Sequence, residues 1–326
     1  MQLQLYKIKT LTDSNQIFSK LQNGTNLPVM ESLKKYIVNE IERMNGFSII
    51  IENGTGQVVG HSLLYEWDHI MYFAFFSAKN DDVEMINKLM NEIQRIAKEK
   101  KCKSILGPVN LPPIIYGYGF AEAGSEPTIF ASAPHNNPIY IELFKQRNYT
   151  IWHRVLHFRI PLSPIKLENK WDVHAVDFSK PDEWKKDFVE IQVKTFPPSA
   201  QITPNRLPAF NDYMEFIQEF GYEEGVLLAH HEGKAIGAGW ATPNPFDLNE
   251  KGKCQTLLLF GGAVLPEYQR LGVLKEIVFG FYNSISHIGH TFGEMPIADD
   301  NVGSCKMAVS YGGKQVRSHV IMELKL

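Results

Sequence analysis

The stretch Leu257-Leu-Leu-Phe-Gly-Gly-Ala-Val-Leu-Pro-Glu-Tyr-Gln-Arg-Leu-Gly-Val-Leu274 is the most informative part of this sequence. It begins as an apolar strand, passes through a short polar loop and enters a helix at Gly272. The first turn of a helix has unpaired N–H groups and a partial positive charge, which suits a phosphate or pyrophosphate. Gly272 allows the backbone to approach such an anion, and Arg270 adds a charged donor. An ordinary strand–helix turn has the same pattern, so this alternative stays open.

Two glycines, Gly261 and Gly262, interrupt the apolar strand. Glycine weakens a strand, and it is found there where the strand bulges or where another extended chain approaches closely. We therefore expect a bulge, or a bound extended chain, at this point.

The elements around this stretch follow an order that occurs twice. The first half is expected to contain a strand at 3–8, helices at 13–22 and 31–44, strands at 47–51, 57–65 and 70–76, and a helix at 82–100. The second half is expected to contain a strand at 173–178, helices at 182–196 and 205–220, strands at 225–230, 234–240 and 256–264, and a helical apolar face from 274 to 288. Each half then closes with strand, helix and strand. The alternative is a chance alternation within one large α/β domain.

The segment 161–170 (PLSPIKLENK) separates the halves, because its prolines and charges follow a strand-like run. We predict two domains, residues 1–162 and 170–326. Each is expected to be an α/β (α+β) unit with a mixed, mostly antiparallel sheet flanked by helices.

Composition narrows the class of protein. The 326 residues carry 33 Lys and Arg against 36 Asp and Glu, a net charge of −3, which argues against a nucleic-acid-binding protein. The N-terminal residues lack an apolar segment, and the longest apolar run, 257–265, is too short to span a bilayer. Three separate cysteines favour neither disulfides nor zinc. We expect a soluble, cytoplasmic protein that is a monomer or homodimer, with no membrane or nucleic-acid partner.

In this context, Val264-x-Pro266-x-x-Gln269-x-x-Gly272 resembles the acetyl-CoA loop of the GCN5-related N-acetyltransferases (GNAT). More narrowly, the chain resembles bacterial and archaeal proteins with two such domains in tandem. The segments that carry this likeness are 107–110 (GPVN), 134–140 (PHNNPIY), 294–301 (EMPIADDN) and Gly312-Gly313.

The resemblance implies acetyl-CoA as co-substrate, no metal, and direct attack of a primary amine on the thioester in a ternary complex. It implies that the pantetheine arm lies along the fourth strand and that backbone amides of the loop hold the pyrophosphate. The residues that it assigns to the co-substrate are Gly262, Ala263, Val264, Gln269, Arg270, Leu271, Gly272, Val273, Leu274 and Asn301.

The sequence departs from the family in two places that bear on catalysis. Leu274 stands where the family has Gly or Ala; it narrows the phosphate pocket unless its side chain points outward. Ala308 stands where many members have a Tyr that protonates the leaving thiolate. Tyr311, almost one helical turn later, is the candidate donor, and its alternative role is packing at the helix end. Ser304, Ser310 and solvent are the other candidate donors.

A general base is harder to name. Glu294, Asp299 and Asp300 lie where a base would reach an amine, and a solvated strand end is the alternative interpretation. The histidines at 230–231, 287 and 290 have no acidic or cysteine partner in register, so no metal site is predicted.

The first half lacks the loop. Its apolar strand runs into Asp81-Asp82, which would repel a pyrophosphate. We interpret this half as a degenerate copy, whose longer segment 111–134 is either an acceptor site or a surface Ω-loop.

Three functions follow as hypotheses. The first is an N-acetyltransferase acting on a primary amine of unknown identity. The second is a non-catalytic acyl-CoA-binding or interaction protein. The third is an aminoacyl- or acyl-transferase of the tandem GNAT type.

Overall fold

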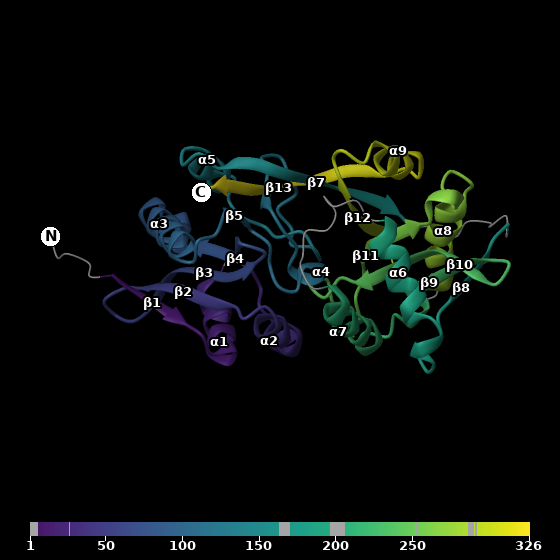
Figure 1. The fold of residues 1–326 in the computed structure, drawn as a ribbon, viewed down its shortest axis with the longest axis horizontal. Coiled ribbons are helices and arrows are strands. Elements are labelled where there is room, and N and C mark those ends of the chain that lie inside the picture. Colours follow the sequence, from purple (N-terminus) through teal and green to yellow (C-terminus); the bar gives the residue numbers. More distant parts are fainter. Residues whose placement is uncertain are drawn as a thin grey trace. The chain divides into compact units, whose positions relative to one another are not determined.

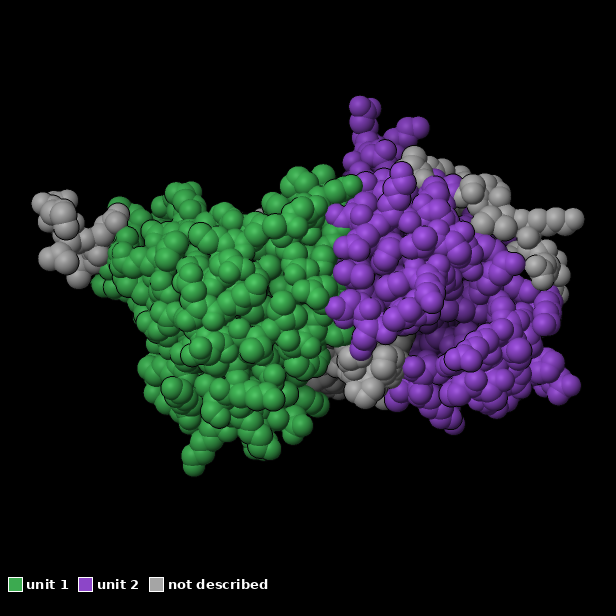
Figure 2. All heavy atoms as spheres, turned by 90° about the horizontal axis from the view of Figure 1, so that it is seen from above, with its two compact units in different colours: residues 1–155, 317–326 green, residues 156–316 purple. Residues whose placement is uncertain are grey.

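The computed structural model describes residues 6–25, 27–162, 170–195, 206–251, 253–285, 290 and 292–326. The chain divides into two compact units, residues 1–155 with 317–326, and residues 156–316 (Figures 1 and 2). The last ten residues therefore belong to the first unit, whereas the sequence placed them in the second domain. None of the described helices is long and apolar enough to cross a membrane.

The first unit is built on a mixed sheet. Its strands, in the order in which they pair, are β1 (Lys7–Leu11), β2 (Phe47–Glu52), β3 (Val58–Trp67), β4 (Ile70–Ala78), β5 (Ser104–Gly107) and β13 (Lys314–Lys325), with β6 (Phe120–Ala121) also on β13. Only the β4–β5 pair is parallel among these described pairs. Residues 104–107 pair with 322–325, which explains why the C-terminus belongs here. Either sheet could take this strand at its edge, so the hydrophobic pattern of the C-terminal residues alone does not predict which sheet they join.

Helices cover both faces of this sheet. They are α1 (Ser14–Gly24), α2 (Lys34–Arg43), α3 (Val83–Glu99), α4 (Pro113–Tyr116) and α5 (Ile139–Lys145). A Cβ on Gly60 of β3 would lie 3.3 Å from Leu89 of α3, whereas His61, the next residue, faces Gly24 of α1. Successive residues of a strand point to opposite faces, so α1 and α3 lie on opposite sides.

The second unit repeats this plan. Its strands pair in the order β12 (Phe292–Ala298), β11 (Leu257–Val264), β10 (Lys234–Pro243), β9 (Val226–His231) and β8 (Asp172–Ala175). Only β11–β12 is parallel among its described pairs. Its helices are α6 (Lys185–Thr195), α7 (Arg206–Glu219), α8 (Val273–Ile285) and α9 (Val302–Ser310). The strand β7 (Thr150–Pro161) crosses the boundary between the units.

Helices also cover both faces of this second sheet, as two neighbouring residues of β10 show. A Cβ on Gly239 would lie 3.0 Å from Phe281 of α8. Trp240 stacks instead on Phe188 of α6 at 5.6 Å and on Phe210 of α7 at 5.5 Å. Gly237 faces Ile277 of α8 as Gly60 faces α3, so the predicted equivalence of the two halves holds in space.

The predicted elements differ from the observed ones mainly at their ends. The first strand begins at Lys7 rather than at residue 3, and residues 1–5 are outside the described part. The helix expected at 182–196 is split into a 3₁₀ turn, Pro181–Glu183, and α6. The helix predicted to reach 288 is described from Val273 to Ile285, and the rest of that prediction, residues 286–288, lies outside the described residues.

Candidate functional site

A bulge interrupts β11 where the sequence has its two glycines. Ala238 pairs with Ala263 and Trp240 with Phe260, so Gly261 and Gly262 together stand opposite Gly239 alone. This is the extra residue of a β-bulge, which bends a strand and interrupts its ladder of hydrogen bonds. The predicted bulge is confirmed.

The loop after β11 is held in shape by its own residues. A 3₁₀ turn, Pro266–Tyr268, follows the strand, and the Gln269 side-chain amide donates a hydrogen bond to the carbonyl of Val264 (3.0 Å). Arg270 and Gly272 both have left-handed backbones, with φ of 64° and 92°. Glycine adopts that conformation without steric cost, so Gly272 explains how the loop turns directly into α8 at Val273.

A cavity of about 500 Å³ lies beside this loop, within the size range of small-molecule sites. It brings together nine of the residues that the resemblance assigns to the co-substrate, namely Gly262, Ala263, Val264, Gln269, Arg270, Gly272, Val273, Leu274 and Asn301. The candidate proton donors Tyr311 and Ser304 line it as well.

Leu271 is the one assigned residue that does not line the cavity. Its side chain is 47% exposed, and its carbonyl accepts a hydrogen bond from the Trp171 indole N–H (3.3 Å). Sequence reasoning missed Lys275, Tyr268 and Thr195, which do line it. Lys275 had a readable signal, because it is a cation in the first turn after the loop; Thr195 comes from α6, far away in sequence.

The charge of the lining suits an anion. Arg270 and Lys275 contribute cations, and there is no carboxylate among the described lining residues. The nearest acid in the first turn of α8, Glu276, is buried and accepts the backbone N–H groups of Lys170 and Trp171 (3.1 and 3.0 Å). A helix N-terminus beside two cations attracts phosphate groups.

Leu274 points toward the strand rather than outward. A Cβ on Gly262 would lie 2.5 Å from Leu274 Cδ1, closer than real Cβ contacts come. The half-buried Leu274 side chain therefore packs directly over the bulge and does not point outward.

Tyr311 lies at the end of α9, on the side of the cavity. Its ring packs 5.0 Å from that of Phe279 of α8, and burial raises the pKa of its phenol. A raised pKa keeps the phenol protonated at neutral pH, as a proton donor requires. Ala308 is fully buried and is not among the described lining residues of the cavity, and its carbonyl accepts the N–H of Gly313 (2.9 Å) at the end of α9.

Asn301 and Ser310 are already engaged by α9. The Asn301 carboxamide caps the helix by accepting the N–H of Ser304 (3.2 Å). The Ser310 hydroxyl donates to the carbonyl of Met307 (2.7 Å), and Ser310 does not line the cavity.

Glu294 lies elsewhere in the unit. It is fully buried in β12 and forms an ion pair with Arg159, whose Nη2 and Nε lie 2.7 and 3.2 Å from its Oε1. It is absent from the described lining of the cavity. The geometry gives Glu294 a structural partner and offers no support for its predicted role as general base. Asp299 and Asp300 are exposed beyond the end of β12.

The corresponding place in the first unit is filled. There the bulge of β4 puts Phe75 and Phe76 opposite Ser62, and Phe75 has a left-handed φ of 47°. The Asn110 carboxamide accepts the Phe75 N–H (2.7 Å) and donates to the Tyr116 carbonyl (2.8 Å). A cavity of only about 30 Å³ remains there.

Two further contacts complete this closure of the first unit. His61 donates from Nδ1 to the Phe75 carbonyl (3.1 Å), and burial lowers the pKa of His61 to about 4, so the ring is neutral. The Asp82 carboxylate accepts the N–H groups of Glu84 and Met85 (2.8 and 3.3 Å) at the start of α3. The segment 111–134 is a surface loop only in its middle: residues 122–129 are exposed or half-buried, whereas Leu111, Ile114–Tyr116, Phe120 and Phe130 on either side are buried.

No family model matches the sequence, and no curated protein matches it. Solved structures do match over nearly the whole chain. A tandem GNAT protein from the clavulanic acid biosynthesis pathway is 13% identical, with 98% of each chain covered and a TM-score of 0.64. A GCN5-related N-acetyltransferase from Sphaerobacter thermophilus is 10% identical, covering 98% of this chain and 95% of that one, with a TM-score of 0.60. A putative acetyltransferase from Pyrococcus horikoshii is 15% identical, covering 100% and 90%, with a TM-score of 0.55. The chain has the tandem GNAT fold, which confirms the predicted fold class.

Proposed function

From this fold, we propose that the second unit binds acetyl-CoA and transfers its acetyl group to a primary amine. The observation that carries the proposal is the cavity of about 500 Å³, in which the strand bulge, the loop and Tyr311 meet. Each of these three parts meets one need of the reaction, whereas in the first unit the Asn110 side chain already takes the N–H of the bulge.

The anionic end of the co-substrate is assigned to the loop. Backbone N–H groups of residues 270–274 and the side chains of Arg270 and Lys275 would hold the pyrophosphate at the start of α8. The pantetheine arm would extend along the bulged edge of β11 at Gly262–Val264, as an added strand does.

The transfer itself forms one bond and breaks another. The amine nitrogen attacks the thioester carbon, the C–N bond forms and the C–S bond breaks. The leaving thiolate takes the proton of the Tyr311 phenol, the amine gives its proton to solvent, and water restores the phenol. Holding both substrates in one complex supplies much of the rate by proximity.

A second candidate is a non-catalytic acyl-CoA-binding protein. The Leu274 side chain favours it, because it packs over the bulge at which the thioester would lie. The buried Ala308, in the place of the usual donor, favours it as well.

One experiment separates the two candidates. Acetyl-CoA binding to the full chain is measured by calorimetry, and release of free thiol is followed with a broad panel of primary amines. An enzyme releases thiol with at least one amine and transfers the acetyl group to it. Binding without thiol release across the panel supports the non-catalytic candidate, and absence of binding contradicts both.

A further inference from the structure

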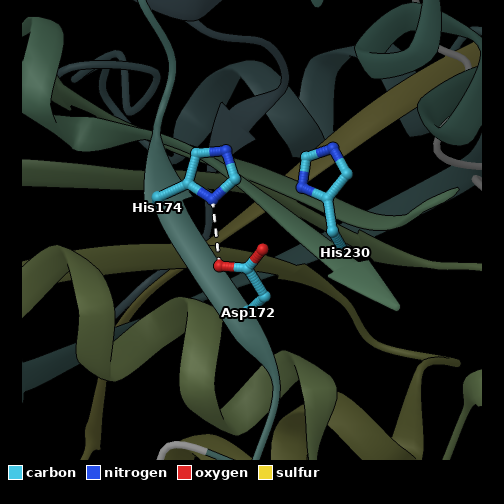
Figure 3. A group of neighbouring side chains, drawn as sticks. All are labelled: Asp172, His174 and His230. Atoms are coloured by element: carbon cyan, nitrogen blue, oxygen red, sulfur yellow. Dashed lines mark hydrogen bonds and ion pairs between the residues drawn. The ribbon is translucent and has the colours of Figure 1, made fainter. Parts of the chain in front are cut away.

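Three side chains that can bind a metal meet at the edge of the second unit's sheet. Strand β8, the last in the pairing order, lies antiparallel to β9. Asp172 is the direct partner of His230, and His174 follows two residues after Asp172. Residues two apart on a strand share a face, and so do direct cross-strand partners. All three side chains therefore project from one face, as Figure 3 shows.

Their donor atoms are close enough to share one ion. One donor from each residue lies within 4.8 Å of the others, and His174 Nδ1 is 3.3 Å from Asp172 Oδ1. Two ligands about 2.05 Å from a tetrahedral zinc ion are themselves about 3.3 Å apart. The Asp172–His174 pair thus has this separation already. The side chains of Asp172 and His174 are 73% and 52% exposed, so they have room to move closer to a shared ion.

His230 has an unsatisfied nitrogen at this place. Its Nδ1 is buried and lacks a hydrogen-bond partner among the described residues, and it points toward the other two side chains (Figure 3). The rings of His174 and His230 stack at 4.9 Å with an angle of 6° between their planes. Burial of a polar atom without a partner has a cost, which a bound cation would remove.

The charge state of the site also suits a metal. Asp172, the cross-strand partner of His230, places a carboxylate beside the imidazole, and Asp187 of α6 adds a second negative charge nearby. A neutral imidazole has the lone pair that a metal needs, and the Asp172 carboxylate supplies a negative charge.

We propose that Asp172, His174 and His230 bind one divalent transition-metal ion of the zinc type. Imidazole nitrogen and carboxylate oxygen are zinc ligands, and three protein ligands leave one position for water. The bound ion would crosslink the edge strand β8 to β9. The proposal does not depend on the acetyl transfer proposed above.

This site corrects the sequence-based expectation that no histidine has an acidic partner. His230 and His231 are neighbours in sequence, but successive residues of a strand point to opposite faces. His231 instead packs against Trp171 and Tyr268, at 5.4 and 5.7 Å between ring centroids. The true partners of His230 precede it by more than fifty residues.

The test is a titration of the full chain, freed of metal by chelation, with Zn²⁺ alone at pH 7.5. We expect one equivalent to bind and the melting temperature to rise. His230→Ala and Asp172→Asn should each weaken binding by more than about 10-fold, the lower limit for losing even an outer-shell partner. His231→Ala, one residue away on the opposite face, is the matched control and should bind as the parent protein does.

Asp172 is exposed, so Asp172→Asn keeps the test valid if His230→Ala does not fold. The proposal is overturned if the parent chain takes up no Zn²⁺ at 100-fold excess. It is equally overturned if either ligand variant binds as tightly as His231→Ala, since the metal would then lie elsewhere.

Discussion

Each unit has a bulged strand followed by a helix, but the bulge of the second unit borders a cavity of about 500 Å³ and that of the first borders one of only about 30 Å³. In the first unit the Asn110 side chain takes the bulge N–H and the Asp82 carboxylate takes the N–H groups at the helix start. In the second unit the equivalent bulge, at Gly261–Gly262, and the loop at Gly272 border a cavity. If the second unit takes the amide-bearing, anionic ligand proposed above, then an amide and a carboxylate of the chain itself occupy the corresponding places in the first unit.

The largest effect on ligand binding is expected from a substitution that closes the cavity of the second unit. Gly272→Glu places a carboxylate and a side chain at a φ of 92°, where non-glycine residues lose about 1–2 kcal/mol. We expect acetyl-CoA affinity to fall by at least about 100-fold, through strain and charge repulsion. Calorimetry on the full chain measures it.

Gly56→Glu is its matched control, because Gly56 has a φ of 79° in an exposed turn of the first unit and open space around it. It should cost similar stability and leave binding intact. Equal loss of binding in both variants would show that the effect is not local to the loop.

The converse change removes the side chain that takes the bulge N–H in the first unit. Asn110→Ala leaves the Phe75 N–H buried without its partner, and an unsatisfied buried donor costs about 1–3 kcal/mol. We expect that loss in the free energy of unfolding by denaturant, with acetyl-CoA binding unchanged. Asn53→Ala, in an exposed turn, should cost less. A second equivalent of acetyl-CoA bound by Asn110→Ala would mean that one amide alone separates the two units.

The donor tyrosine gives a smaller effect. Because a thiolate is a good leaving group, Tyr311→Phe should reduce the rate of transfer by about 10-fold at neutral pH and leave acetyl-CoA binding unchanged. Since burial raises the pKa of Tyr311, the acid form persists as pH rises, and the parent rate should not fall on the alkaline side before the ordinary tyrosine range near pH 10.

Ser310→Ala, whose hydroxyl is bonded within α9, is the control for the tyrosine and should transfer at the parent rate. Identical pH–rate profiles for Tyr311→Phe and the parent protein would remove Tyr311 as the donor.

The smallest effect concerns the side chain over the bulge. Leu274→Ala removes the atoms nearest Gly262 and gives position 274 a small residue. We expect acetyl-CoA to bind about 3-fold more tightly, roughly 0.7 kcal/mol, as judged by calorimetry. Leu248→Ala, an exposed leucine outside the cavity, serves as control. Weaker binding by Leu274→Ala would identify the leucine as a contact for the ligand instead of an obstacle.

Local chemistry was readable from the sequence, whereas contacts between distant segments were not. The bulge follows from two glycines in a strand, and the loop follows from Gln269 and Gly272, whose roles are set by neighbouring backbone. The orientation of Leu274, the reach of Asn110 into the bulge and the meeting of Asp172 with His230 depend on packing and strand pairing. Nothing in the spacing of these residues encodes them.

The C-terminal strand has a consequence for how the chain is made. Residues 317–326, with the buried Ile321 and Met322, complete the sheet of the first unit, although all of residues 156–316 are synthesised in between. At about 5–20 residues per second, the ribosome needs on the order of 10–30 s for that interval. During this time the nascent first unit exposes the edge of β5, and an open strand edge invites wrong pairing. The usual order, in which an N-terminal domain is finished before the next one emerges, is thus reversed for the last step: the unit that is translated first is completed only after residues 317–326 have been made.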